Sequence, residues 1–309
     1  MFKKSFVVLA VLAIAAMMIV ACAPAAEEAA PAEEAAPAEE AAPAEEAEEA
    51  MEEEAALSGQ LQLAGSTTVQ PLAEVLAESF MDSNPDVSID VQGGGSSVGV
   101  TAAGEGTADI GMSSRNIKDS EFEIFPELEV FTIAYDGIAV VVNPDVELPT
   151  LSVEQVRAIF SGEVTNFSEV GGSDAPITVV SREEGSGTRA AFEELALEYE
   201  DENGEDVIAP IAEAALLQQS NGQVRTVVAE TPNSIGYLSF GFLDDSTKGV
   251  AIDGVEPTVD NVKNESYPIY RPLNMETGGA PGDLAQAFLD FILSADGQAI
   301  VAEDYITVN

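Results

Sequence analysis

The chain has 309 residues, with 56 acidic side chains, 11 basic ones, no histidine and one cysteine. A formal net charge of −45 argues against nucleic acid as a partner. Without histidine no Ser-His-Asp triad can be built, and a single cysteine allows no internal disulfide. The length is sufficient for a sizeable core and for two lobes.

The first 21 residues have the pattern of a secretory signal peptide. Lys3 and Lys4 precede an apolar run over 6–20, which is shorter than the roughly 20 residues that a membrane-spanning helix needs. The run ends in Val-Ala-Cys at Cys22. This ending resembles a lipoprotein signal, in which the cysteine is lipidated and becomes the mature N-terminus. The alternative is an ordinary signal peptide with an incidental cysteine.

Residues 22–58 are predicted to be a disordered tether rich in Ala, Pro and Glu. The stretch 23–56 holds thirteen Glu and no Lys or Arg, and Pro31, Pro37 and Pro43 recur six residues apart. It has no apolar periodicity with which to build a core, and its like charges favour an extended chain. It is either a spacer that lifts a domain off a membrane or an unselected low-complexity tail.

From residue 59 onward, strand and helix patterns alternate. β-branched and aromatic residues predict strands at 61–65, 86–92, 177–181 and 234–240. Apolar stripes predict helices over 67–80, 151–160, 188–199 and 282–293. In the second of these, Ser152 and Gln155 form a capping box. Such alternation predicts an α/β fold with a mainly parallel sheet. A long strand over 130–143, with an Asp-Gly break, is interpreted as a connection between two lobes.

Three turns of one kind each follow a predicted strand and precede a helix. They combine Gly with Ser or Thr at 65–68, 93–97 and 185–188, and a weaker case lies at 220–222. Such turns leave free N–H groups where the helix dipole favours negative charge. Any one of them could be plain capping. Three at the carboxyl ends of strands favour a shared anion site.

The turns do not match the common catalytic or nucleotide-binding motifs. The sequence Gly185-Ser186-Gly187 misses the G-x-S-x-G nucleophile elbow. No glycine turn is followed by Lys and Ser/Thr, so no P-loop is evident, and the sequence has no Cys/His cluster for a metal. We therefore expect no cofactor, no metal and no enzyme. A lysine- or carboxylate-based enzyme stays open as an alternative.

Six segments in order resemble the PstS-type phosphate-binding lipoproteins of ABC phosphate importers. They are AGSTTVQPLAE, VQGGGSSVGV, ADIGMSSR, DGIAVVVN, VRAIFSGEVTNF and SREEGSGTR. The resemblance covers residues 60–309. It implies a periplasmic-binding-protein fold of type II, with two α/β lobes, two crossovers and phosphate in the cleft. Lobe 1 would span 59–135 plus 245–309, and lobe 2 would span 136–244.

The resemblance also implies a set of phosphate ligands drawn from the three turns and the Ser-Ser-Arg segment. Arg182 would be the cation, with Glu184 orienting it; the alternative for Arg182 is a surface ion pair with Glu183 or Glu184. The implied ligands are Ser66, Thr67, Thr68, Ser96, Ser97, Ser114, Arg115, Arg182, Ser186, Gly187 and Thr188.

One position departs from the family pattern. Well-known members carry Asp about where this chain has Ser114, and that carboxylate accepts the hydrogen of protonated phosphate and repels sulfate. A hydroxyl can donate or accept, so the means of rejecting sulfate is open. Without the leader and the tether glutamates, 43 acidic and 9 basic residues remain. Such a domain repels phosphate at long range, so binding must rest on local hydrogen bonds.

The expected function is an exported, membrane-anchored receptor that captures inorganic phosphate and delivers it to the permease subunits of an ABC importer. The nearest alternative is the same fold binding another oxyanion. Alternatives from other classes are an enzyme or inhibitor on this scaffold, and an adhesion or surface-layer module.

Overall fold

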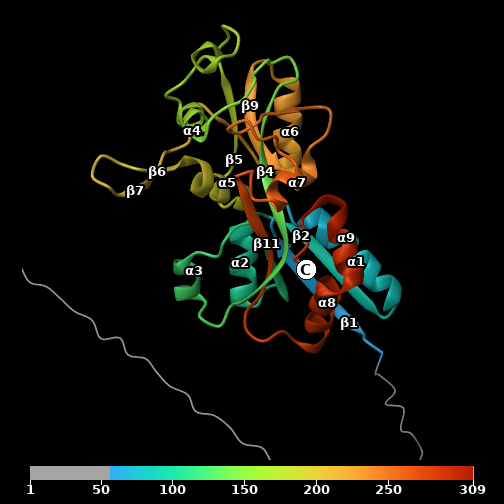
Figure 1. Ribbon diagram of the computed structural model, residues 1–309. Coiled ribbons are helices and arrows are strands. Elements are labelled where there is room, and N and C mark those ends of the chain that lie inside the picture. Colours follow the sequence, from blue (N-terminus) through green and yellow to red (C-terminus); the bar gives the residue numbers. More distant parts are fainter. Residues whose placement is uncertain (1–55, 309) are drawn as a thin grey trace, which may run out of the picture. The chain divides into compact units, whose positions relative to one another are not determined.

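The computed structural model describes residues 56–308, so the expected signal peptide, Cys22 and nearly all of the tether lie outside the described residues. Two large hydrophobic clusters form the core. Figure 1 shows the helices and strands gathered in two lobes, which are joined by β4 (Glu129–Val142) and β11 (Tyr270–Thr277). The two strands pair with each other in antiparallel register. The expected two-lobed α/β architecture is therefore confirmed.

A nine-stranded sheet runs through both lobes in the order β2-β1-β3-β11-β4-β9-β5-β8, with β10 paired to β4 off this path. The outer neighbours pair in parallel, whereas β4 and β11 run antiparallel to each other and to β9 and β3. The expectation of a mainly parallel sheet thus holds for the outer strands only. Besides β4 and β11, the strands of this sheet are β1 Gly59–Gly65, β2 Val87–Gly93, β3 Ile110–Ser113, β5 Thr178–Arg182, β8 Leu216–Gln218, β9 Ser234–Ser239 and β10 Lys248–Gly249.

The first lobe packs helices against β1, β2 and β3. The apolar stripe predicted for residues 67–80 is buried at Val69, Leu72, Leu76 and Phe80, as its helical spacing requires. Phe80 meets the ring of Phe288 edge-on, with centroids 5.3 Å apart. The helices are α1 Gln70–Ser83, α2 Ser96–Glu105, α3 Asp119–Ile124, α8 Asp283–Leu293 and α9 Ala295–Asp304. Within residues 56–308, a membrane could be crossed, by length and composition, only by α8 and α9 as a pair bent by 61°.

The second lobe packs around stacked aromatic rings. The rings of Phe192 and Tyr237 lie 4.0 Å apart and nearly parallel, and Phe160 packs against both. The predicted capping box is confirmed, because Ser152 Oγ accepts from the Gln155 N–H and the Gln155 side chain accepts in return. The helices are α4 Val153–Ser161, α5 Gly187–Phe192, α6 Asn221–Glu230 and α7 Val259–Lys263, with short helical turns η1 Phe167–Val170, η2 Glu193–Leu197 and η3 Phe240–Phe242.

Two local predictions are wrong. The helix expected to run from Thr188 to Tyr199 changes to a π-helical turn after Phe192, and Tyr199 lies in β6 (Glu198–Glu200), which pairs with β7 (Asp206–Ile208). The Arg157 guanidinium lies 4.7 Å from the Tyr199 ring centre and holds it there. The Asp-Gly step in β4 is no break either, because Asp136 pairs with a residue of β11.

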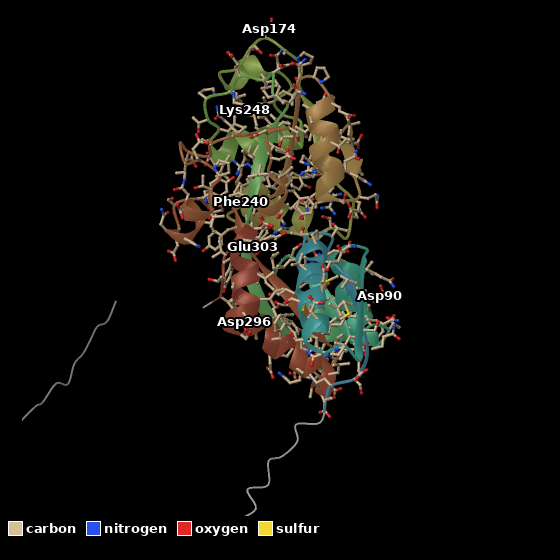
Figure 2. The ribbon with its side chains drawn as sticks, turned by 90° about the vertical axis from the view of Figure 1, so that its right-hand side faces the viewer. Asp90, Asp174, Phe240, Lys248, Asp296 and Glu303 are labelled. Carbon is tan, nitrogen blue, oxygen red and sulfur yellow. The ribbon has the colours of Figure 1, made fainter. Side chains whose placement is uncertain are left out.

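The junction between the lobes is tightly packed. Figure 2 shows Phe240 between Lys248 in one lobe and Asp296 in the other. A Cβ added at Gly137 would lie 2.4 Å from the Phe240 ring, so this strand can approach η3 only without a side chain at that position. The crossing strands are therefore fixed against the second lobe beside the turns that carry the candidate site.

Candidate anion-binding site

The starts of four helices, two from each lobe, converge at the junction. Thr68, just before α1, has its Oγ1 3.0 Å from Thr188 Oγ1 in α5 and 2.8 Å from Asn221 Nδ2 in α6. The start of α2 is equally close, because a Cβ added at Gly187 would lie 2.0 Å from Ser96 Oγ. The structure therefore brings together the three strong turns and the weaker fourth at the carboxyl ends of strands.

Three buried serine hydroxyls form a chain within the first lobe. Ser66 Oγ accepts from the N–H groups of Thr68 and Val69, and donates to Ser114 Oγ over 3.0 Å. Ser96 Oγ accepts from the Ser114 N–H at 3.0 Å and lies 3.4 Å from Ser114 Oγ. A hydroxyl has two lone pairs and one proton, so Ser66 must donate. Ser114 Oγ therefore accepts from Ser66, and its second lone pair is free when its own proton points to Ser96 Oγ.

Arg182 brings a positive charge to these hydroxyls. The residue is 1% exposed, and its Nη2 and Nη1 lie 3.1 Å from Thr67 Oγ1 and 3.5 Å from Thr188 Oγ1. Its Nε and Nη2 each donate over 3.0 Å to one carboxylate oxygen of Glu183. The expectation that Glu184 orients Arg182 is wrong: Glu183, next in the chain, meets two guanidinium nitrogens at once, and Glu184 is exposed.

Arg115, Ser97 and Ser186 lie beside the hydroxyl cluster and already have partners in the protein. Arg115 donates to both oxygens of Glu121 at 2.7 and 2.8 Å, and more weakly to Ser97 Oγ at 3.4 Å. Burial acts to raise the pKa of Glu121, but hydrogen bonds from Arg115 and a backbone N–H bring that pKa below its ordinary value. Ser186 Oγ accepts from the Arg189 N–H, which is plain helix capping. A ligand role for these three residues stays a prediction.

Sequence reasoning missed another buried cation, Arg271. The register of β11 on β4 sets it opposite Asp136, and its Nε and Nη2 lie 3.1 and 2.9 Å from Asp136 Oδ2. Arg271 also donates to Thr68 Oγ1 at 3.3 Å and to the Ser114 carbonyl at 3.0 Å. Burial raises the pKa of Asp136 and lowers that of Arg271, while their mutual attraction acts in the opposite sense. No local sequence motif predicts this ion pair, because only the register of the two strands brings its residues together.

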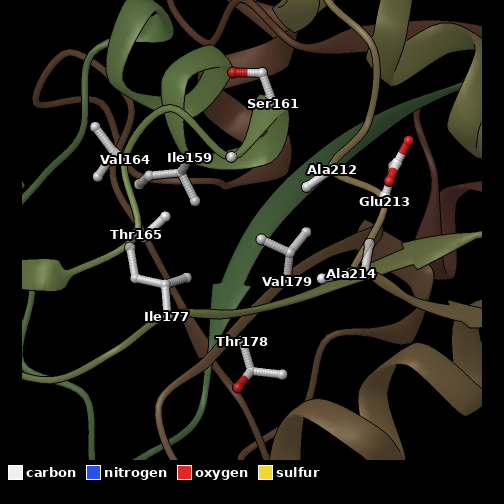
Figure 3. Close-up of a pocket in the computed structure, with 12 residues that line it drawn as sticks. Ile159, Ser161, Val164, Thr165, Ile177, Thr178, Val179, Ala212, Glu213 and Ala214 are labelled. Atoms are coloured by element: carbon white, nitrogen blue, oxygen red, sulfur yellow. The ribbon is translucent and has the colours of Figure 1, made fainter.

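One prominent cavity of the described residues lies elsewhere. It has a volume of about 450 Å³ and is mainly apolar, and Glu213 is its single charged lining residue (Figure 3). A carboxylate there repels anions, so this cavity is no counterpart of the converging turns. Another cavity of about 260 Å³ borders the site at Ser97 and Ser186, and its lining holds two cations, Lys118 and Arg189, and two carboxylates, Glu184 and Glu193.

The convergence of hydroxyl, N–H and guanidinium donors suits a small anion with several oxygens. Comparison with known proteins supports this chemistry. The model of the PBP superfamily domain matches residues 50–296. The phosphate-binding protein PstS of Bacillus subtilis (strain 168) is 38% identical over 247 residues, which are 79% of this chain and 79% of that protein. PstS of Borreliella burgdorferi is 31% identical over 77% of this chain and 86% of its own length.

Solved structures agree with the curated relatives. A protein from Clostridium perfringens solved with bound phosphate superposes with a TM-score of 0.75 and 39% identity, over 81% of this chain and 100% of that chain. An ABC-type phosphate transport receptor from Vibrio cholerae gives a TM-score of 0.67 and 34% identity, over 80% and 99% of the two chains. This chain therefore belongs to the PstS family of phosphate-binding proteins, within the PBP superfamily.

Proposed function

We propose that this chain captures inorganic phosphate outside the cytoplasm and delivers it to the permease subunits of an ABC importer. The relatives are named for phosphate binding and phosphate transport, and none of those cited is named as an enzyme. The observation that carries the proposal is local: Arg182 is buried among hydroxyls from both lobes. A buried cation beside many hydrogen-bond donors favours a desolvated oxyanion over any neutral ligand.

The proposed ligands fall into an inner and an outer group. The inner hydroxyls and Arg182 hydrogen-bond to one another, with Arg182 also held by Glu183, while the outer residues bond only to groups outside this cluster. In the proposal, closure of the lobes completes the shell, because Thr68 and Thr188 come from different lobes. The inner group comprises Ser66, Thr67, Thr68, Ser96, Ser114, Arg182, Gly187 and Thr188, and the outer group comprises Ser97, Arg115 and Ser186.

Ser114 supplies the acceptor that phosphate requires. At neutral pH phosphate carries at least one hydrogen and sulfate carries none, so a fixed acceptor favours phosphate. With Ser66 donating to it and its own proton directed to Ser96 Oγ, Ser114 Oγ keeps one lone pair for that hydrogen. A hydroxyl discriminates less strongly than a carboxylate, because it can also turn its proton toward sulfate. This observation favours a second candidate function, a receptor for oxyanions in general.

Calorimetric titration of the whole mature protein with phosphate and with sulfate tests the function. We expect one phosphate per chain, weaker binding of sulfate and no consumption of the ligand. Equal affinities for phosphate and sulfate would favour the second candidate function, a receptor for oxyanions in general. Absence of any phosphate binding would remove the proposal, and turnover of a phosphate ester would point to an enzyme instead.

We also propose that the protein is held at the outer face of the membrane by a lipid on Cys22, with 22–58 as its spacer. The support is the Val-Ala-Cys ending of the apolar run, which lies outside the described residues. Cys22→Ala should release the protein from the membrane fraction. Its affinity for phosphate should equal that of wild type. If the variant and wild type fractionate alike, the lipid anchor is wrong and the leader is an ordinary signal peptide.

The two lobes are proposed to divide near the crossing strands, as 59–135 plus 245–309 and 136–244, with one adjustment. Val250, Ile252, Tyr267 and Ile269 are buried in the cluster of the second lobe. We therefore assign the stretch 245–269, which includes β10 on β4, to lobe 2, so that the second crossover is β11 itself. Backbone amide exchange should then protect this stretch together with β4 and β9 rather than with α8.

A further inference from the structure

Arg271 holds three separate parts of the junction at once. It is 2% exposed, and it donates to Asp136 in β4, to the carbonyl of Ser114 and to the hydroxyl of Thr68. Asp136 in turn accepts from the Ser239 hydroxyl and the Phe240 N–H of the second lobe. A buried guanidinium with so many partners has a fixed position, so its contact with Thr68 is fixed as well.

The hydrogen bonds around Thr68 determine where its proton points. Its Oγ1 receives Arg271 Nη2 at 3.3 Å and Asn221 Nδ2 at 2.8 Å. Guanidinium is a donor only, and the amide of Asn221 cannot be reversed, because its Oδ1 accepts from the Ser239 N–H. Both lone pairs of Thr68 Oγ1 are therefore occupied. Its own proton must be donated, and Thr188 Oγ1 lies 3.0 Å away.

The same count applied to Thr188 gives its role. Thr188 Oγ1 accepts from Thr68 and, at 3.5 Å, from Arg182 Nη1. Among the described residues no acceptor faces the remaining Thr188 proton. Only its proton is left, so this hydroxyl can act toward a ligand only as a donor. A donor oriented in advance binds an anion better than a hydroxyl that must first turn.

We propose that Arg271 and Asn221 are positioning residues that act through Thr68 to make Thr188 an obligate hydrogen-bond donor to the bound anion. The inference rests on the proposed phosphate function and deepens it. The relay crosses the junction, since Arg271 and Thr68 belong to the first lobe's strand and turn while Asn221 and Thr188 begin helices of the second. Closing the lobes thus orients the donor in the same step.

A double-mutant cycle separates this role from a simple charge effect. Arg271→Lys keeps the charge beside Asp136 but removes the forked donors, and Thr188→Val removes the oriented hydroxyl with little change of shape. Phosphate affinity is measured by calorimetry in the whole mature protein. We expect Arg271→Lys to weaken binding about two- to tenfold in wild type, the range for one neutral hydrogen bond. With Thr188→Val already present, the further loss should be less than about twofold.

A second variant guards against a misfolded Arg271→Lys protein. Asn221→Leu leaves the ion pair intact and removes the other donor to Thr68, so it should show the same dependence on Thr188. Arg225→Lys is the matched control, because Arg225 lies in the same helix as Asn221 and pairs with Asp244 at the surface. It should leave the affinity unchanged. Thermal unfolding of each variant verifies that it is folded.

The outcomes are distinct. If Arg271→Lys or Asn221→Leu lowers the affinity by the same factor with and without Thr188→Val, these residues do not act through Thr188 and the inference is wrong. No loss in the wild-type background also overturns it. In both cases wild type still binds phosphate, so the proposed function stands. Failure of wild type to bind phosphate removes the function and this inference together.

Discussion

Arg182 is the residue whose loss should affect binding most. Its guanidinium is buried, reaches hydroxyls of both lobes and is held in place by Glu183. Hydrogen bonds to charged groups contribute about 1.5–3 kcal/mol each. Arg182→Ala should therefore weaken phosphate binding about ten- to 150-fold in a calorimetric titration.

Two controls frame this result. Arg225→Ala removes an exposed arginine paired with Asp244 and should leave the affinity unchanged. Glu183→Gln keeps Arg182 charged and loosens its position, so it should cost much less than Arg182→Ala. Unchanged phosphate binding in Arg182→Ala would reduce Arg182 to the partner of a structural ion pair.

Ser114 should determine the preference for phosphate over sulfate. Its Oγ accepts the proton of Ser66 and, with its own proton directed to Ser96 Oγ, keeps one lone pair for the hydrogen of phosphate. Ser114→Ala leaves that hydrogen unpaired, at a cost of about 1–3 kcal/mol, and frees Ser66 to donate to either anion. Competition titrations should show the phosphate-to-sulfate preference falling about five- to 150-fold. If Ser114→Ala keeps the preference for phosphate over sulfate, the acceptor for the hydrogen of phosphate is another residue.

For single residues, the sequence predicts the hydroxyl residues of the turns but not the charged residues that hold them in place. Ser66, Ser96 and Thr188 could be found because glycine and hydroxyl residues stand between strand and helix patterns. Arg271 and Asp136 could not, because each is one polar residue inside a strand, and only the register of β11 on β4 joins them. The choice of Glu183 over Glu184 depends on the direction of side chains at the end of β5, which spacing does not give.

Among the elements, the start of α5 lies close against the first lobe. Gly187 lies so near α2 that an added Cβ would be 2.0 Å from Ser96 Oγ and 2.6 Å from Ser114 Oγ. Gly187→Ala should therefore hinder closure while leaving each lobe folded. We expect phosphate affinity to fall at least about tenfold, because the inner hydroxyls are pushed apart, with little change in the far-ultraviolet circular dichroism.

Gly222 is the matched control for this prediction. It also lies at a helix start, in α6, but its nearest neighbours would be 3.9 Å from an added Cβ. Gly222→Ala should preserve affinity and stabilise the helix slightly. If Gly187→Ala also binds phosphate normally, the close approach of α5 to α2 is not needed in the bound state.

Local chemistry explains which elements were predictable. The helix of residues 153–161 is fixed at its start by the Ser152–Gln155 capping box, a signal that lies within four residues. The helix expected to reach Tyr199 ends early, because its last turn competes with the pairing of β6 with β7 and with the contact to Arg157. The first depends on neighbours in sequence and the second on neighbours in space, which periodicity cannot detect.

For the molecule as a whole, the positions of the basic residues bear on how so acidic a protein can bind an anion. The net charge of −45 is spread over the chain, whereas Arg182 and Arg271 are buried at the junction and Arg115, Lys118 and Arg189 lie around it. Because Arg182, Arg271, Arg115 and Arg189 each pair with a carboxylate, they offset the long-range repulsion of phosphate only through short-range hydrogen bonds from their donors. The sequence gives the total charge but not this gathering, since these residues are far apart along the chain.

The stability of the whole protein should depend on the protonation of Glu276. This residue of β11 is fully buried, its Oε1 accepts from Ser113 Oγ, and its Oε2 has no partner among the described residues. Burial raises the pKa of Glu276 from 4.5 to about 8. In the unfolded chain the carboxyl loses its proton near its ordinary pKa, so between these values unfolding releases a proton. The free energy of unfolding should therefore fall as the pH rises, by up to about 1.4 kcal/mol per pH unit.

Glu276→Gln tests this pH dependence, because the neutral amide has nearly the same shape and cannot ionise. Urea unfolding at pH 5, 7 and 8.5 should show the variant gaining on wild type as the pH rises, with the largest difference at pH 8.5. Glu78→Gln, an exposed change on α1, is the matched control and should follow wild type at every pH. A constant difference between Glu276→Gln and wild type across this range would mean that Glu276 does not hold its proton in the folded protein. Because Glu276 hydrogen-bonds to Ser113, the neighbour of Ser114 in the chain, repeating the unfolding measurements with phosphate present would report whether its ionisation also reaches the site.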